Sequence, residues 1–598
     1  CGSYSPHPLR ARSSSRRGST GPTDGPRPPP SQDLPPDYPS SGRQFEAPDE
    51  RRRAHGARRR GLRPASGDAS RLARPVIGRI AAGLTALAWL SLVTAAIGQG
   101  PVGNAFATAL VLPLALVLVL RTAAESLRRA TPRVPVVAGV LVAITLAAIA
   151  ATPWLVRAAT GLPSGSLHEL TTNFAVVTVP GSLLLLLCGA LGSGLPARER
   201  PTLTARAAAI GGSVSVAGMV AFLRLFQGQV TSAEWTRDMA SWLAGTATSA
   251  VAVTAAVLAV ARWRWVPAPD TETTDTEYTH ATTAWFAVAV TLGLGASLLA
   301  CRAVWAATGI DETSRGLDPT VVPGVAALVA AAAVVVVAHL VVGQPLVDAW
   351  QRRACAIALT STVDPGLLRS EIARTYRRGL TVPAVVTVPV SVALVVFAVP
   401  LMGLLVTARQ PSEIAASASV LAMLAPLPAA LGVILLNHRI LGLAGPRHTA
   451  LTLTIPVAAI VAMAALGAAL LRTEWVTLAL AAGLSLAGVL TAALGSWVTR
   501  HNLDNFGSTG AGRTLARTLL AALGAGYVAW GLVIALTRAL AGLGRPGYAA
   551  LLALGGMLFG VVYFLLLRLL HVQELADLVV PVVNRYDRRP PGRHRPGE

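Results

Sequence analysis

Residues 476–499 read VTLALAAGLSLAGVLTAALGSWVT, a run of 24 residues without a charged side chain. About 20 consecutive apolar residues are enough to cross a hydrocarbon layer roughly 30 Å thick. Because no water is available at that depth, the segment must satisfy its own backbone hydrogen bonds, as an α-helix does. The stretch therefore predicts a transmembrane helix.

Similar apolar blocks recur on both sides of this stretch, separated by short polar segments. Of the 598 residues, 53% are hydrophobic and 13% are charged, whereas a soluble chain carries about 25% charged residues. The sequence thus predicts an all-α polytopic membrane protein with about 14 transmembrane helices, and it disfavours a large soluble core. The predicted spans are residues 76–98, 104–120, 135–156, 173–193, 207–225, 239–261, 283–308, 320–343, 382–407, 417–437, 450–471, 476–499, 516–539 and 547–570.

The basic residues indicate how these spans are oriented. All 51 of them are arginine, and the net charge is +22. Such a charge on a soluble domain would suggest nucleic acid, but here the arginines lie in the N-terminal segment and in alternate loops. With the N-terminus inside, 20 arginines fall in inner loops and span ends and 8 in outer ones. Loops rich in arginine stay in the cytoplasm, so we expect a plasma-membrane protein with both termini cytoplasmic.

The chain divides by composition into five segments. We predict a disordered basic cytoplasmic tail at 1–74, an N-terminal helical bundle of about 8 spans at 75–343 and a cytoplasmic or interfacial linker at 344–381. A C-terminal bundle of about 6 spans at 382–571 and a cytoplasmic tail at 572–598 complete it. Within the linker, Leu367, Leu368 and Ile372 recur at helical spacing among arginines. An amphipathic interfacial helix and a plain cytoplasmic loop explain this pattern equally well.

Sequence signatures of enzymes do not occur in the chain. We find no HExxH, P-loop or GxSxG motif and no pair of carboxylates within a span. The cysteines Cys1, Cys188, Cys301 and Cys355 have no CxxC spacing, so neither a disulfide framework nor a metal site is indicated. We therefore expect no catalytic residues, no metal and no cofactor.

Ionisable residues inside spans are costly and are functional candidates for that reason. Arg302 lies within the seventh predicted span, Arg79 near the inner end of the first, and Arg121 closes the second. Each has a simpler explanation, because an arginine near a span end can extend its guanidinium to the headgroups. His339 is more typical of a hydrogen-bonded packing residue, and Asp348 is the nearest candidate for a buried acid.

Four stretches resemble the lipid II flippase family, MurJ or MviN, within the superfamily of multidrug and lipid-linked oligosaccharide exporters. Gly98-Gln99-Gly100 with Asn104-Ala105-Phe106 and Leu112-Pro113 is similar to the family's turn and the opening of its second helix. The other three are Arg439 to Thr449, the segment from Ala358 to Leu380 before a proline-containing ninth span, and Leu566 to Arg585 with Glu574. Fourteen spans with both ends inside are also the family's arrangement.

This resemblance implies two pseudo-symmetric helical bundles around a central cavity. It further implies transport of lipid II, an undecaprenyl-diphosphate-linked peptidoglycan precursor, from the inner to the outer leaflet by alternating access. Arg79, Arg121 and Arg302 are the candidate diphosphate-binding residues that it suggests, because guanidinium pairs with phosphate. The expected partners are the lipid-linked precursor, membrane lipids and cell-wall synthesis proteins, with no nucleic acid.

Two alternatives remain open at this stage. The family's second first-helix arginine falls on Thr85, and its aspartate before Ala-Phe is Asn104. These differences are compatible with export of another lipid-linked polysaccharide unit. They are also compatible with a flippase fold that no longer transports and instead serves as a scaffold for cell-envelope synthesis.

Overall fold

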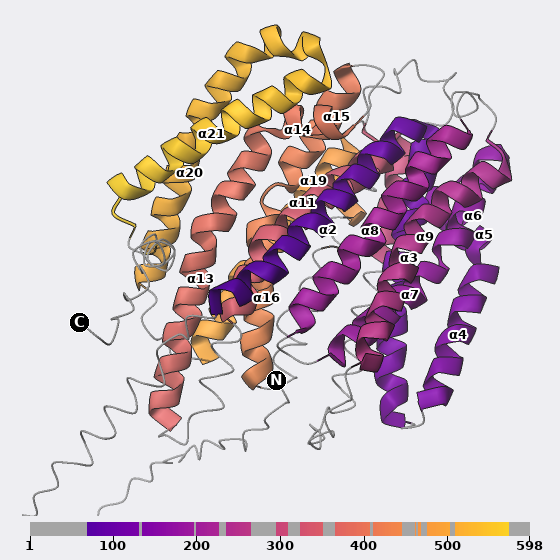
Figure 1. Ribbon diagram of the computed structural model, residues 1–598, viewed down its shortest axis with the longest axis horizontal. Helices are drawn as coiled ribbons and strands as arrows, with labels where there is room; N and C mark the ends of the chain where they lie inside the picture. Colours follow the sequence, from indigo (N-terminus) through magenta and orange to yellow (C-terminus); the bar gives the residue numbers. More distant parts are fainter. Residues whose placement is uncertain are drawn as a thin grey trace, which may run out of the picture. The chain divides into compact units, whose positions relative to one another are not determined.

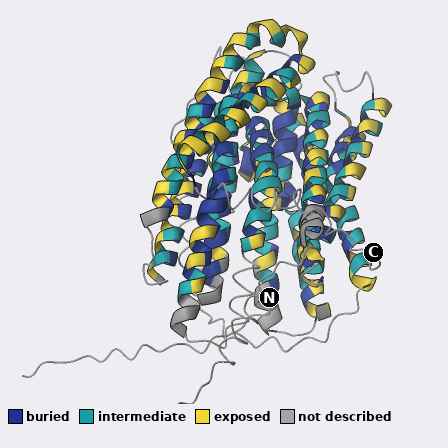
Figure 2. Ribbon diagram, turned by 60° about the vertical axis from the view of Figure 1, so that its left-hand side comes forward, coloured by how far each residue is buried: buried dark blue, intermediate teal, exposed yellow. Residues whose placement is uncertain are grey.

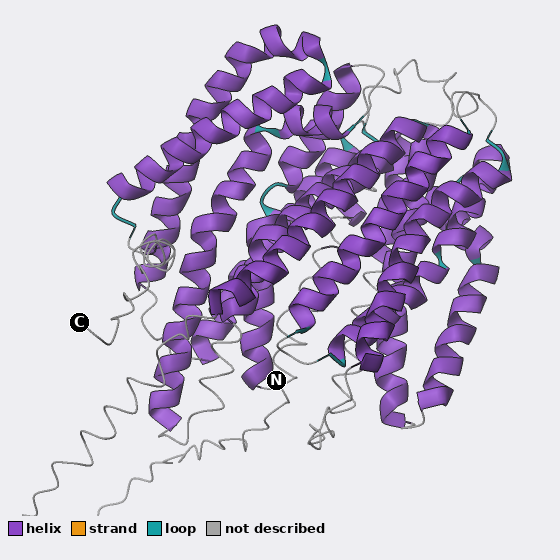
Figure 3. Cartoon of the chain, in the orientation of Figure 1, coloured by secondary structure: helices purple, strands orange, loops and turns teal. Residues whose placement is uncertain are grey.

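The chain folds into long helices, which are followed here in a computed structural model (Figure 1). The structure describes residues 68–130, 134–195, 199–226, 235–264, 295–308, 323–350, 365–406, 411–444, 461, 465–467, 475–502, 509–572 and 574. Throughout these residues the secondary structure is helical, with turns and short loops and without a strand (Figure 3). The chain divides into two units, Tyr4–Ala73 and the remainder. Except for residues 68–73, the residues that the structure describes belong to the larger unit, which includes Arg74–Glu598.

The elements are numbered as in Figure 1. The first half of the chain contains α2 (Asp68–Ile97), α3 (Pro101–Ala130), α4 (Val134–Ala150), α5 (Thr152–Thr160), α6 (Ser166–Thr178), α7 (Pro180–Ser193), α8 (Arg200–Leu225), α9 (Arg237–Arg264), α11 (Val325–Ala338) and the π-helix η1 (His339–Gly343). The second half contains α13 (Pro365–Val396), α14 (Ala398–Leu405), α15 (Pro411–Leu424), α16 (Leu427–Ala444), α19 (Val476–Asn502), α20 (Thr509–Leu540), η3 (Ala541–Leu543) and α21 (Arg545–Leu569).

The predicted all-α membrane architecture is confirmed. Eleven helices in the described part of the chain are long and apolar enough to cross a membrane, and a bent pair, α4 with α5, makes a twelfth. These twelve coincide with twelve of the fourteen predicted spans. Of the other two, the span predicted at 283–308 is described only from residue 295, where it is helical, and the span at 450–471 lies almost wholly outside the described residues.

Prolines mark three of the places where a span is interrupted. The axes of α4 and α5 differ by 59°, and Pro153 stands in the first turn of α5. In the same way, Pro180 begins α7 directly after α6, and Pro426 stands between α15 and α16. Proline lacks a backbone N–H and its ring crowds the preceding turn, so it ends or bends a helix.

Two large apolar clusters form the core of the helical assembly. One joins side chains of α2, α3, α5, α6, α8, α9 and α11 with Val476 and Leu480 of α19. The other joins Leu90 of α2 and four residues of α11 to α14, α15 and α19. Since both clusters contain residues from the two halves of the sequence, they pack the two groups of helices against each other.

Large apolar side chains are also exposed along the outer helices, as the yellow surfaces of α20 and α21 illustrate (Figure 2). Leu520, Tyr527, Leu565 and Leu569 are each more than half exposed. A soluble protein rarely exposes a continuous apolar face of this kind. The hydrocarbon of a bilayer is the environment that such a face requires.

The segment predicted as a linker contains two described helical stretches. The helix of α11 and η1 continues to Trp350, and α13 begins at Pro365. Residues 367–378, which are amphipathic in sequence, belong to the same continuous helix as the ninth predicted span. The predicted tail at 1–74 lies outside the described residues up to position 67, and α2 begins at Asp68.

Candidate functional site

A cavity of about 660 Å³ lies between α2, α3, α6, α7, α8, α9 and α11. Its walls are mostly aliphatic, with hydroxyl groups at intervals. Arg79 lies toward the end that the arginine distribution predicts to be cytoplasmic, and Trp89 lines the cavity about three turns further along α2. Among the described residues that line it, Arg79 is the one with a positive charge.

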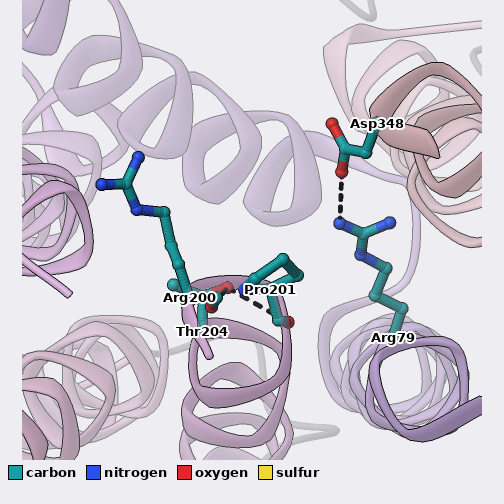
Figure 4. Close-up of polar contacts among 5 residues, drawn as sticks. All are labelled: Arg79, Arg200, Pro201, Thr204 and Asp348. Atoms are coloured by element: carbon teal, nitrogen blue, oxygen red, sulfur yellow. Dashed lines mark hydrogen bonds and ion pairs between the residues drawn. The ribbon is translucent and has the colours of Figure 1, made fainter. Parts of the chain in front are cut away.

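Arg79 forms an ion pair with Asp348, a residue of the helical stretch that follows η1. Its Nη2 donates a hydrogen bond of 2.7 Å to Asp348 Oδ2, as the dashed line in Figure 4 marks. The side chains are 13% and 17% exposed. Removing one member of such a shielded pair would leave a charge without its partner, which is strongly unfavourable.

Small residues allow α2 to approach its neighbours closely around this pair. A Cβ at Gly83 would lie 2.9 Å from Val337 Cγ1, and one at Gly212 would overlap the Thr85 hydroxyl. Both contacts are tighter than ordinary side-chain packing permits. The glycines therefore set how near α2 lies to α8 and α11, and thus where Arg79 stands.

Three hydroxyls of the cavity wall already have partners on neighbouring helices. The Thr178 hydroxyl donates to Ala109 O at 2.8 Å, and the Thr248 hydroxyl donates to Val177 O at 2.9 Å. The Ser215 hydroxyl donates to Thr246 O at 2.7 Å. Interhelical hydrogen bonds of this kind hold membrane helices together. They leave the Arg79 guanidinium as the strongest polar feature of the cavity.

Aromatic rings pack around Trp89, toward the opposite end of the cavity. The Trp89 indole N–H donates to Thr246 Oγ1 at 3.0 Å, and its ring lies 6.2 Å from that of Phe106. Phe106 in turn contacts Phe174 at 5.2 Å, and Phe174 contacts Trp235 at 6.2 Å. These rings belong to the apolar cluster that packs the two groups of helices together, and of the four only Trp89 is among the described residues that line the cavity.

Of the three arginines predicted as diphosphate-binding residues, one lies among the described residues that line the cavity. Arg79 lines the cavity, whereas Arg121 and Arg302 are exposed and are not among the described lining residues. Arg302 lies beside Gly161, at the end of α5, because a side chain at Gly161 would meet its guanidinium. The structure thus pairs Arg79 with Asp348, and neither of the other two arginines is among the described residues that line the cavity.

The hydroxyl-bearing wall of this cavity is not evident from the sequence. In the sequence, Thr178, Ser215 and Thr248 are single polar residues within apolar spans. The available signal was that serine and threonine in membrane helices commonly bond to neighbouring helices. Asp348 was recognised only as a candidate buried acid, and nothing in the sequence indicated its partner.

The described residues contain no group of three or more His, Cys, Asp or Glu side chains placed to hold a metal ion. His339, which begins η1, has its Nδ1 3.3 Å from the carbonyl oxygen of Pro428, in the first turn of α16. This contact fits the packing role that is typical of a single histidine in a span.

Comparison with known proteins gives a structural likeness without sequence similarity. No protein-family model matches the chain, and no curated protein sequence matches it. A solved structure of the lipid II flippase MurJ in an inward closed conformation is similar, with a TM-score of 0.54 and 11% identity over 82% of this chain and 99% of MurJ. An inward-facing multidrug resistance transporter of the MATE family, in the MOP superfamily, has a TM-score of 0.45 and 14% identity over 72% of this chain and 96% of its own.

The likeness to MurJ concerns the fold. A nearly complete alignment of MurJ at this TM-score means that the helices follow a similar path in both chains. The fold class predicted from the sequence, a polytopic α-helical membrane protein with a MurJ-like arrangement, is confirmed. Fold alone does not define a cargo, so activity has to be argued from the cavity and its residues.

Proposed function

We propose that the protein is a flippase of the plasma membrane that moves an undecaprenyl-diphosphate-linked cell-wall precursor, lipid II, from the inner to the outer leaflet by alternating access. The observation that carries the proposal is the cavity within a MurJ-like fold, which has the Arg79 guanidinium toward one end and Trp89, packed against further aromatic rings, toward the other. Such an arrangement suits a site that is loaded from the side of the membrane on which the charge lies.

The chemistry of the cavity supports an anionic lipid headgroup as cargo. A diphosphate in hydrocarbon is prohibitively costly unless a cation accompanies it. Arg79 supplies that cation, and a planar guanidinium can pair two of its N–H groups with phosphate oxygens. The largely aliphatic walls suit the part of the cargo next to the diphosphate, while the lipid tail stays in the bilayer.

One observation favours a second candidate, a scaffold without transport activity. Among the described residues that line the cavity, the one guanidinium is already paired with Asp348, so this pair of side chains carries no net charge. A protein that kept the fold but lost transport would have no further need of a free cation there. Its partners would then be cell-wall synthesis proteins.

The deciding experiment measures lipid II in the outer leaflet. In cells whose other lipid II flippases have been removed, depletion of this protein should reduce the access of an outer-leaflet probe to lipid II and weaken the wall. Arg79→Ala should fail to restore that access, whereas Arg374→Gln, which alters an exposed ion pair on α13, should restore it fully. Unchanged access together with displaced wall-synthesis enzymes would reject transport in favour of the scaffold.

A further inference from the structure

The ion pair at the cytoplasmic end of the cavity uses only a small part of the guanidinium's bonding capacity. A guanidinium has five N–H donors, and Asp348 Oδ2 accepts from one nitrogen of Arg79. Within the described residues Arg79 has no other hydrogen-bond partner. Its remaining donors are therefore open to an anion that enters the cavity.

Arg200, on the neighbouring helix α8, does not compete for this pair. Its side chain is directed away from Arg79 and Asp348 in Figure 4. Its Nη2 instead donates hydrogen bonds to the carbonyl oxygens of Ser193 and Leu195. Of these two described arginines, Arg79 is therefore the one placed to exchange anions at this end of the cavity.

We propose that Asp348 is a specificity-determining residue that keeps singly charged phospholipid headgroups off Arg79 and admits a lipid diphosphate. The proposal rests on the proposed function, because it concerns the cargo of the same cavity. It assigns to Asp348 the discrimination between the cargo and the anionic lipids among which the protein is embedded.

The charges explain why one anion is excluded and the other admitted. A phosphodiester headgroup carries one negative charge, as the Asp348 carboxylate does, so exchanging one for the other yields little electrostatic gain. The carboxylate is tethered beside Arg79, whereas a lipid loses translational freedom when it binds. A diphosphate carries more charge and offers oxygens to several N–H groups at once, so it can displace the carboxylate or bind beside it.

This selectivity of Asp348 matters because the cytoplasmic leaflet is rich in anionic lipids, which would compete with the cargo for Arg79. Without it, an arginine facing a lipid-accessible cavity would be occupied by the commonest anion present. The partly shielded setting of the pair makes the competition effective, since water screens it less than it screens the exposed pair Glu371–Arg374, whose side chains are 50% and 68% exposed.

Cys188 provides the readout, because its side chain lines the same cavity. The full chain, with Cys1→Ser, Cys301→Ala and Cys355→Ser, is placed in nanodiscs of zwitterionic lipid. The rate at which a methanethiosulfonate reagent modifies Cys188 is then measured with added undecaprenyl diphosphate or with phosphatidylglycerol. We expect the diphosphate to slow the modification several-fold and phosphatidylglycerol to leave it unchanged.

The variants distinguish selectivity that is set by Asp348 from a general effect of removing a carboxylate. In Asp348→Asn and in Asp348→Ser both lipids should slow the modification, and in Arg79→Gln neither should. Glu371→Gln, which removes the carboxylate of the exposed pair, should behave as the parent protein does. A parent protected equally by both lipids, or neutral Asp348 variants that still ignore phosphatidylglycerol, would overturn the proposal.

The same variants in proteoliposomes distinguish this proposal from the one it rests on. If the parent protein discriminates between the two lipids but moves no lipid II across the bilayer, the proposed function is rejected and the selectivity assigned to Asp348 is retained. If it transports lipid II without discriminating between the headgroups, only the selectivity assigned to Asp348 is rejected.

Discussion

The side-chain oxygen of Asn104, on α3, accepts a hydrogen bond of 3.0 Å from the backbone N–H of Ala326, in the first turn of α11. The first N–H groups of a helix have no partner within the helix, so Asn104 caps a helix that begins more than 200 residues later. Gly324 allows this approach, because a Cβ there would overlap the Asn104 amide. One of the residues that carry the resemblance to flippases thus has a clear structural role.

We predict that Asn104→Ala lowers the free energy of unfolding by about 1 kcal/mol, the usual effect of removing a cap. Asn104→Asp should preserve it, because a carboxylate accepts the same hydrogen bond and is favoured at a helix N-terminus. Thermal unfolding in detergent measures both, with the exposed Ser213→Ala as control. Equal losses for the Ala and Asp variants would show that the hydrogen bond is not what matters.

A second prediction concerns a buried polar contact among α13, α16 and α19. The Tyr376 hydroxyl donates to Asn437 Oδ1 at 2.6 Å, and Asn437 Nδ2 donates to Ser496 Oγ at 3.2 Å. Tyr376→Phe should lower stability by about 1–3 kcal/mol, because the buried amide oxygen loses its donor. Tyr527→Phe, at a side chain that is 73% exposed, is the control. A similar melting temperature for both variants would argue against this role of the hydroxyl.

Close packing of α8 on α9 leads to a third prediction. A Cβ at Gly211 would overlap the carbonyl oxygen of Ala250, whereas one at Gly189 would meet nothing within 4 Å. Gly211→Val should therefore force the two helices apart and reduce the yield of folded protein, while Gly189→Val should not. Monodisperse protein after size-exclusion chromatography is the measurement. Equal yields would mean that the helices can separate without loss.

The fourth prediction ranks the arginines by their distance from the cavity. Arg79→Ala should abolish the transport of lipid II, because it removes the positive charge of the lining. The sequence predicts that Arg302→Ala impairs function more than Arg545→Ala, but Arg302 lies exposed beside Gly161. Its loss should consequently be smaller than that of Arg79. A flippase assay in proteoliposomes at matched protein amounts checks this order, and an Arg302 variant as inactive as Arg79→Ala would contradict it.

The membrane architecture can be predicted from the sequence because each spanning helix is encoded by its own run of apolar residues. A run such as residues 476–499 predicts a spanning helix from its own composition, and the structure places α19 there. The interruptions at Pro153 and Pro180 agree with the chemistry of proline, but Pro113 and Pro389 lie inside helices that continue, so proline alone does not predict where a span breaks. The expected fourteen spans could be drawn without knowing which helices touch.

The candidate site was harder to predict because it depends on contacts between distant residues. Arg79 and Asp348 are 269 positions apart, and neither has a sequence neighbour that indicates the other. In the sequence Arg302 is the stronger candidate, because it lies further inside an apolar span than Arg79 does. Which of them faces the cavity is decided by the rotation of each helix against its neighbours, and close approaches such as that at Gly83 fix this rotation.

The last prediction tests the orientation of the chain with two exposed serines at opposite ends of one predicted membrane segment. Ser164 precedes α6 and Ser193 ends α7, and together α6 and α7 form the candidate span Ser166–Ser193. These serines are better probes than Gly161, whose φ of 71° disfavours other residues, or Gly194, where a Cβ would crowd Arg262. If inner loops carry the arginines, a membrane-impermeant thiol reagent should label Ser164→Cys in intact cells and Ser193→Cys only after lysis. The reverse pattern would invert the topology and place Arg79 at the outer surface.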